Sequence, residues 1–127
     1  MMIWPRVSQI WFVDTTIIWG ERCDGSDKSN EHPSLVLHED CGYTRSYITS
    51  SRRTEYARYQ AERGNERFGW FSPQETGLRN GFGADYSEAA RKVEIPQHRN
   101  CIGTMAAERF QEFSKLHACY CRARWDM

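Results

Sequence analysis

Histidine and cysteine side chains crowd the stretch HACYC, residues 117–121, where they could hold a metal ion. On a helix, His117 and Cys121 lie four positions apart and share a face, which is a spacing that can chelate zinc. A second group of possible ligands lies earlier in the chain: Cys23, His32, His38 and Cys41. No Cys-x2-Cys pair accompanies these residues, and the other interpretation is a helix that buries both side chains. We favour burial and expect neither a metal nor another cofactor.

The stretch WFVDTTIIW, residues 11–19, offers a second kind of chemistry because an apolar strand leads directly to Asp14. It resembles the first strand of PIN-domain nucleases, where an apolar strand leads to Asp, a small hydroxyl residue and further apolar residues. The resemblance covers this stretch alone and implies that Asp14 is a Mg²⁺ ligand of a nuclease. Further carboxylates match by type only: Glu39, Asp40, Glu55 and Asp85. Asp-Thr-Thr is also typical of a turn, in which these side chains accept backbone hydrogen bonds, and we favour the turn.

Arginines and aromatic residues alternate between residues 43 and 70. Arginine neutralises phosphates, and exposed aromatic rings stack on unpaired bases. The same residue types anchor protein interfaces. The pattern therefore predicts a surface that binds nucleic acid or an acidic protein, and the other interpretation is a solvated helix with ion pairs such as Glu55–Arg58. The predicted binding residues are Arg45, Arg52, Arg53, Tyr56, Arg58, Tyr59, Arg63, Arg67 and Trp70.

The first part of the chain must position these residues, and its sequence patterns are mostly typical of strands. Runs of β-branched and aromatic residues at 10–13 and 17–19, and the apolar run 35–38, predict short strands. The segment 23–34 is rich in Gly, Ser, Asp and Asn and predicts a loop. A helix should begin at Ser50 or Ser51 and end at Gly64.

Helix signals follow in the second part. Asp85 with Glu88 three residues later forms a capping-box pattern and predicts a helix over 86–94, which Pro96 would stop. Thr104 should cap the longest helix, whose apolar residues recur at three- and four-residue steps as far as Trp125. Strands before helices predict an α+β fold. We expect a small N-terminal antiparallel sheet of two to four strands, packed by about three helices with the longest at the C-terminus, in one domain spanning residues 1–127.

Composition constrains the class of protein. The chain has a formal net charge of zero and a pI near 6.9, so a homo-oligomer is a reasonable expectation. Only four leucines accompany 17 aromatic residues, which predicts an aromatic core. No segment is apolar over the ~20 residues that a membrane-spanning helix needs, so we expect no membrane partner. Five cysteines without a secretory leader lead us to expect a cytoplasmic location.

The leading interpretation is a small non-enzymatic binding domain that uses residues 43–70 to engage nucleic acid or an acidic protein surface. The first alternative is a Mg²⁺-dependent nuclease built around Asp14, and the second is a zinc-stabilised structural domain. A sequence without an evolved function is a further alternative that the low leucine count suggests. The capping patterns and the periodic last helix argue against it, because local signals that agree with one another are typical of a foldable sequence.

Overall fold

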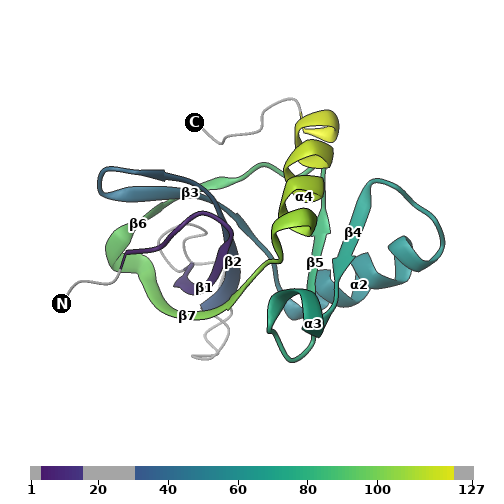
Figure 1. The fold of residues 1–127 in the computed structure, drawn as a ribbon, viewed down its shortest axis with the longest axis horizontal. Helices are drawn as coiled ribbons and strands as arrows, with labels where there is room; N and C mark the ends of the chain where they lie inside the picture. Colours follow the sequence, from purple (N-terminus) through teal and green to yellow (C-terminus); the bar gives the residue numbers. More distant parts are fainter. Residues whose placement is uncertain (1–3, 16–30, 122–127) are drawn as a thin grey trace.

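The computed structural model describes residues 4–15 and 31–121 of the chain (Figure 1). Five strands form one antiparallel sheet in the order β6-β3-β2-β1-β7, and two more form a separate antiparallel pair. The five are β1 (Gln9–Asp14), β2 (Glu31–Asp40), β3 (Tyr43–Ile48), β6 (Arg91–Glu94) and β7 (His98–Thr104). The separate pair is β4 (Phe68–Phe71) and β5 (Phe82–Asp85). The helices are α2 (Ser51–Glu62), α3 (Pro73–Thr76), α4 (Ala107–Tyr120) and the short 3₁₀ helix η3 (Ile95–Gln97).

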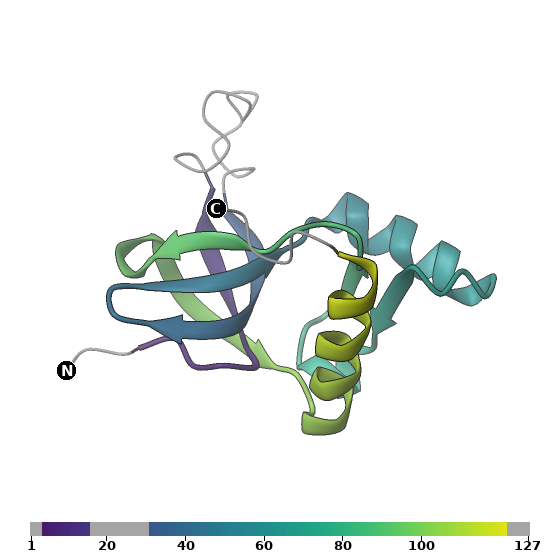
Figure 2. The same cartoon turned by 90° about the horizontal axis from the view of Figure 1, so that it is seen from above.

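The five-stranded sheet curls strongly. Strands β6 and β7 lie at its opposite edges, yet only the three residues of η3 connect them. A flat sheet could not place its two edges so close together, so the sheet bends toward a barrel. Figure 2 shows this curled sheet beside the unit of α2, β4, α3 and β5, which is inserted in the chain between β3 and β6.

Both faces of the central strands are buried, and each face has its own apolar cluster. One face contributes Trp11, Val13, Val36, Ile48 and Val93. The opposite face contributes residues such as Ile10, Leu35 and Tyr47, which join one cluster with Phe82 of the inserted unit. This double burial explains why the run Leu-Val-Leu at 35–37 is continuously apolar rather than alternating with polar residues.

Helix α4 joins the sheet to the inserted unit (Figure 1). Its Phe113 is fully buried and packs against the rings of Tyr47, Phe71 and Tyr86, with centroids 5.4–5.9 Å apart. Phe110 and Leu116 pack partly buried against the same cluster. The aromatic core expected from the composition is therefore present, and α4 is the longest helix of the described residues, at 14 residues.

The expected sheet of two to four strands within the first 48 residues is wrong, because the described residues form a five-stranded sheet and a separate two-stranded one. Residues 91–104 add two edge strands, and residues 68–85 add the β4–β5 pair. In place of the expected helix over 86–94, Asp85 ends β5 and Arg91–Glu94 forms β6. Pairing of Thr44 with Val93 and of Ser46 with Arg91 outweighs the local helix preference of this alanine- and charge-rich stretch.

Some of the other local expectations are confirmed and others are wrong. The strands expected at 10–13 and 35–38 lie within β1 and β2, and Ser50 caps α2 by accepting a hydrogen bond from the Arg53 amide at 3.1 Å. Gly64, just after α2, has a positive φ of 85°. Thr104 ends β7 instead of capping α4, whose N-cap is Ala106. The strand expected at 17–19, Cys23 and the end of the chain after residue 121 lie outside the described residues.

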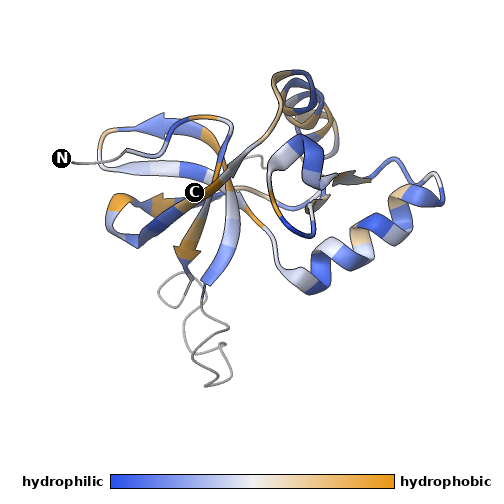
Figure 3. Cartoon of the chain, turned by 60° about the horizontal axis from the view of Figure 1, so that its bottom comes forward, coloured by the Kyte–Doolittle hydropathy of each residue, from blue (hydrophilic) through white to orange (hydrophobic). Residues whose placement is uncertain are grey.

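Hydropathy follows this arrangement. Helix α2 is mostly hydrophilic, whereas strands of the curled sheet carry both hydrophilic and hydrophobic stretches (Figure 3). Within the described ranges, no helix is both long enough and apolar enough to cross a membrane.

Candidate functional site

A groove of about 860 Å³ runs between the curled sheet and the inserted unit. Three stretches line it: the first two turns of α2, the ends of β1 and β2 around Phe12 and His32, and the loop from Gly77 to Gly81 between α3 and β5. Trp70 of β4, Pro73 and Gln74 of α3, and Ile102 of β7 complete the lining. The groove is within the size range of small-molecule sites, which bury most of a ligand in a concave surface.

Arg58 and Trp70 are in contact with each other in the groove lining. The guanidinium carbon of Arg58 lies 4.3 Å from the Trp70 ring centroid, a cation–π arrangement. Glu62, one turn further along α2, accepts a hydrogen bond from Arg58 Nε at 3.3 Å and orients the guanidinium. The Arg58 side chain is still 54 % exposed, so its outer surface is available to a ligand.

Two residues fix the position of Trp70: Gly81 lies close to the indole nitrogen, and Arg109 binds the backbone carbonyl. Gly81 has a φ of 75°, and a Cβ at this position would meet Trp70 Nε1 at 3.0 Å and the Phe71 carbonyl oxygen at 2.4 Å. Only glycine fits there. The Trp70 carbonyl accepts a hydrogen bond from Arg109 of α4 at 3.1 Å. Trp70 Nε1 is buried and has no hydrogen-bond partner among the residues that the structure describes.

His32 stands on the opposite side of the groove, near the start of β2. Its Nδ1 lies 3.0 Å from Thr15 Oγ1, and the ring is partly buried. Burial lowers the pKa of His32, because the charged imidazolium loses hydration. The side chain is therefore mostly neutral at pH 7 and can both donate and accept a hydrogen bond.

The loop between α3 and β5 supplies further polar groups of the groove. Ser72 and Glu75 form a capping box at the start of α3, and Gly77 ends that helix with a φ of 78°. The side chain of Leu78 is buried and anchors the loop in the core. Arg79 and Asn80 are exposed and line the groove. The two arginines of the lining are matched by two glutamates, Glu31 and Glu55, so the groove is polar rather than strongly basic.

Of the nine predicted binding residues, Arg58 and Trp70 line the groove. Two others form ion pairs: Arg53 with Glu88 at 3.4 Å and Arg67 with Asp85 at 3.2 Å. The remaining five lie outside the groove lining: Arg45, Arg52, Tyr56, Tyr59 and Arg63.

Four of these five residues follow one another at three- and four-residue steps along α2 and its C-cap and so share one helix face, whereas Arg45 lies on β3. Tyr56 and Tyr59 are exposed by more than half on α2, and the Arg63 guanidinium covers the Tyr59 ring at 5.1 Å. Arg52 is exposed at the start of α2. Arg45 lies on β3, where its guanidinium is 5.4 Å from the Tyr43 ring. The fold thus places four of these residues on one face of α2, outside the groove lining, and Arg45 on another element.

The carboxylates considered for a Mg²⁺ site lie on different elements. Asp14, at the end of β1, forms an ion pair with Arg99 at 3.0 Å. Glu39 on β2 pairs with Arg6, and Asp85 at the end of β5 pairs with Arg67. Across residues 4–15 and 31–121, no three His, Cys, Asp or Glu side chains gather in a way that could hold a metal ion.

The residues considered as zinc ligands differ in their burial and in their hydrogen-bond partners. His117 is buried and its Nε2 lies 2.8 Å from the Glu88 carbonyl oxygen, so it acts as the hydrogen-bonded core histidine that we favoured. Cys121 is also buried. His38 and Cys41 are exposed in and beside the β2–β3 turn.

Sequence reasoning did not select His32 as a binding residue, nor Arg79 and Asn80. The stretch GLRNGFG, residues 77–83, is typical of a loop because of its glycines and Asn80. Loops held by a rigid scaffold carry many binding residues, and an arginine and an asparagine between glycines are a signal of this kind. The chain matches no model of a known protein family, and no curated protein matches it, so these residues alone carry the functional argument.

Proposed function

We propose that the protein binds single-stranded nucleic acid non-covalently in the groove between α2, the β1–β2 end of the sheet and the 77–81 loop. The observation that carries this proposal is the Arg58 guanidinium stacked on Trp70. Unpaired bases stack on aromatic rings and on arginine planes, each contact contributing about 1–3 kcal/mol. The exposed outer surface of Arg58 provides such a plane.

Groups around this stack suit the other parts of a nucleotide. Arg79 and Asn80 are exposed on the adjacent loop, where they can contact phosphate and base edges. His32 is mostly neutral and adds a polar imidazole to the groove lining. A single strand exposes the faces of its bases, whereas a duplex keeps them stacked, so the groove favours single strands.

An acidic protein is supported less well. Such a partner needs a field of positive charge, but Glu31 and Glu55 offset the two groove arginines. Arg53 and Arg67, outside the groove, already have carboxylate partners. Because the groove charge is balanced, stacking should contribute more than phosphate attraction, and the salt dependence of binding should be shallow.

The test is fluorescence anisotropy with a labelled single strand of about eight nucleotides. Arg58→Ala should weaken binding roughly tenfold, because it removes one stacking surface. Arg52→Ala is the matched control: it removes an exposed arginine from the same helix but outside the groove, and should leave the affinity unchanged. Thermal melts should show that both variants remain folded.

Two results would contradict the proposal. Equal weakening by Arg52→Ala and Arg58→Ala would show that only general charge attraction is measured. Displacement of the strand by a polyglutamate peptide, with the same sensitivity to Arg58→Ala, would show that the groove binds acidic protein instead.

A further inference from the structure

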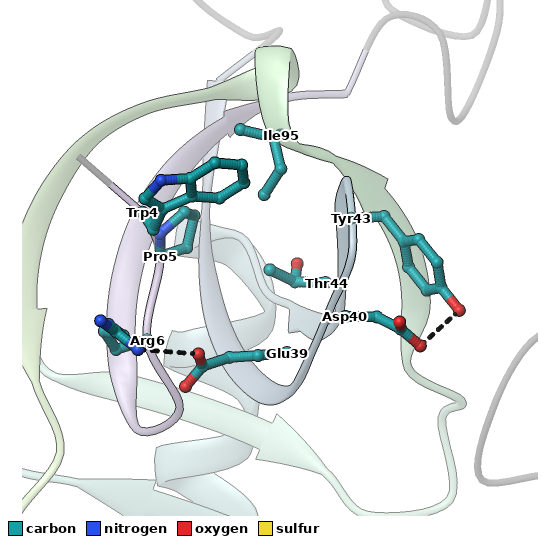
Figure 4. Close-up of a pocket in the computed structure, with 8 residues that line it drawn as sticks. All are labelled: Trp4, Pro5, Arg6, Glu39, Asp40, Tyr43, Thr44 and Ile95. Carbon is teal, nitrogen blue, oxygen red and sulfur yellow. Dashed lines mark hydrogen bonds and ion pairs between the residues drawn. The ribbon is translucent and has the colours of Figure 1, made fainter. Parts of the chain in front are cut away.

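A second, smaller pocket of about 280 Å³ lies beside the β2–β3 turn, and its two carboxylates have partners within the protein (Figure 4). One oxygen of Glu39 lies 3.4 Å from Nη1 of Arg6. Asp40 accepts a hydrogen bond from the Tyr43 hydroxyl at 2.8 Å. The acidic groups of this pocket are therefore satisfied inside the fold and need no donor from a ligand.

The two glutamates of the groove, Glu31 and Glu55, are different. The carboxylate of neither one forms a hydrogen bond or an ion pair with a residue that the structure describes. Both residues are exposed, so water satisfies these carboxylates as long as no ligand covers them. A ligand that fills the groove displaces this water, and a carboxylate left without donors would then oppose binding. A ligand that binds tightly must therefore bring its own N–H or O–H donors.

Glu55 lies one turn before Arg58 on α2. Side chains three positions apart on a helix are neighbours, with Cβ atoms about 5–6 Å apart. Arg58 donates from its Nε to Glu62, on the following turn, at 3.3 Å, and its guanidinium lies over the Trp70 ring. Glu55 is thus the carboxylate beside the stack whose oxygens are open to a ligand. A base stacked on the exposed surface of Arg58 would present its edge to Glu55.

The edges of the bases differ in how they suit a carboxylate, which has two acceptor oxygens and no donor. Guanine presents two adjacent donors on its Watson–Crick edge, N1–H and the N2 amino group. Adenine and cytosine place one amino group beside a ring nitrogen that accepts, and uracil and thymine place N3–H between two carbonyl oxygens. Only guanine can donate to both oxygens of a carboxylate without turning an acceptor toward them, and such charge-assisted pairs are among the stronger hydrogen bonds.

We infer that the groove selects guanine, whose ring stacks on Arg58 and whose N1–H and N2 amino group donate to the two oxygens of Glu55. This inference rests on the proposed function, because it assigns a base to the same groove. It also gives a reason for acidic side chains in a groove that binds an anion. They reduce the general attraction to phosphate, but a carboxylate beside the stack discriminates between bases.

The test measures a ratio of affinities by fluorescence anisotropy. One labelled strand contains only thymine over about eight nucleotides, and the other has a single central guanine. The guanine strand should bind roughly tenfold more tightly, because a bidentate pair discriminates against bases that cannot form it. Hypoxanthine in place of guanine lacks the N2 amino group and should lose most of this gain. All three strands carry the same charge, so general attraction does not affect the ratio.

Variants assign the preference to one carboxylate. Glu55→Gln should abolish the gain from guanine, because an amide has one acceptor oxygen and would turn an N–H toward one of the guanine donors. Glu66→Gln removes an exposed acid outside the groove lining and is the matched control, in which the tenfold ratio should persist. Partial unfolding would weaken all strands alike, so it cannot imitate a lost preference.

The outcomes distinguish this inference from the proposed function. If neither strand binds, or if Arg58→Ala does not weaken the thymine strand, the proposed function fails and the inference fails with it. If the thymine strand binds and depends on Arg58 but guanine brings no gain, the inference alone is overturned. A gain that persists in Glu55→Gln, or that is lost in Glu31→Gln instead, would also overturn it.

Discussion

His98 is the side chain that connects η3 to the interior of the curled sheet. Its Nδ1 lies 3.0 Å from the Glu94 carbonyl oxygen, and because a carbonyl only accepts, this nitrogen carries the proton. Its Nε2 then accepts from the Thr44 hydroxyl at 3.1 Å, and its ring meets Trp11 edge-on at 5.9 Å. The neutral imidazole thus satisfies both of its nitrogens inside the fold.

This environment predicts a loss of stability on mild acidification. Burial lowers the pKa of His98 in the folded state more than its backbone hydrogen bonds raise it, and the same direction holds for His32. The unfolded chain therefore takes up protons first. Stability should be constant above the unfolded pKa of about 6.5 and should fall as the pH decreases toward the folded pKa. Thermal melts between pH ~7.5 and ~5 measure this.

Variants assign the effect to a residue. His98→Gln should show a smaller decrease in melting temperature over this pH range than the parent. His38→Gln removes a histidine whose side chain is 55 % exposed and should retain the full decrease. An NMR titration in which His98 protonates at or above pH ~6.5 would contradict the prediction.

At the scale of elements, the position of α2 depends on the absence of a side chain at Gly83 of β5. A Cβ there would lie 2.5 Å from Thr54 Cα and 2.9 Å from the Thr54 carbonyl oxygen. The Gly83 amide donates to Thr54 Oγ1 at 3.2 Å, and its carbonyl accepts from Thr49 Oγ1 at 2.6 Å. The helix and strand therefore touch through their backbones, and this contact sets the distance from Arg58 to Trp70.

Gly83→Ala should push α2 away from β5 and lower the free energy of unfolding by about 1–3 kcal/mol. It should also weaken nucleic-acid binding, because Arg58 would move relative to Trp70. Gly42→Ala is a matched control: it strains the β2–β3 turn, where φ is 85°, but leaves α2 in place. Urea unfolding and the anisotropy assay measure both variants. Equal loss of binding in both would show that binding follows stability rather than the position of α2.

On the scale of the whole molecule, one apolar cluster joins the curled sheet to the inserted unit. It includes Leu35 and Tyr47 of the sheet, Phe71 and Phe82 of the inserted pair, and Phe113 of α4. Arg109 of α4 adds a polar connection, since it forms an ion pair with Glu75 at 2.9 Å and donates to the Trp70 carbonyl.

A shared cluster predicts that both parts unfold together. Urea unfolding should give coincident curves by tryptophan fluorescence and by far-UV circular dichroism, with a total stability of about 5–15 kcal/mol. Phe113→Ala should move both curves by the same amount, because it removes a side chain that contacts both parts. Two separate transitions, or a shift in only one signal, would show that the inserted unit is a domain of its own.

Local signals in the sequence determined several elements correctly. The Ser50 cap and the breaker Gly64 bound α2, and apolar runs mark β1 and the buried centre of β2. The seventeen aromatic residues predicted an aromatic core, which Phe113 and its neighbours form. The cap, the breaker and the apolar runs each depend on residues within a few positions of one another, and the aromatic core follows from composition, so the sequence contains the information for both.

Tertiary structure alone decided the size of the sheet and the composition of the groove. Strand β6 is stable because Val93 pairs with Thr44, and β7 because Thr104 pairs with Gln9, partners distant in sequence. The energy of a strand comes from such partners rather than from its own residues, so the stretch 86–94 could look helical and still pair. The groove is likewise assembled from three separate stretches. The sequence selected Arg58 and Trp70 by their residue types, but only the tertiary structure places His32 in the same groove lining.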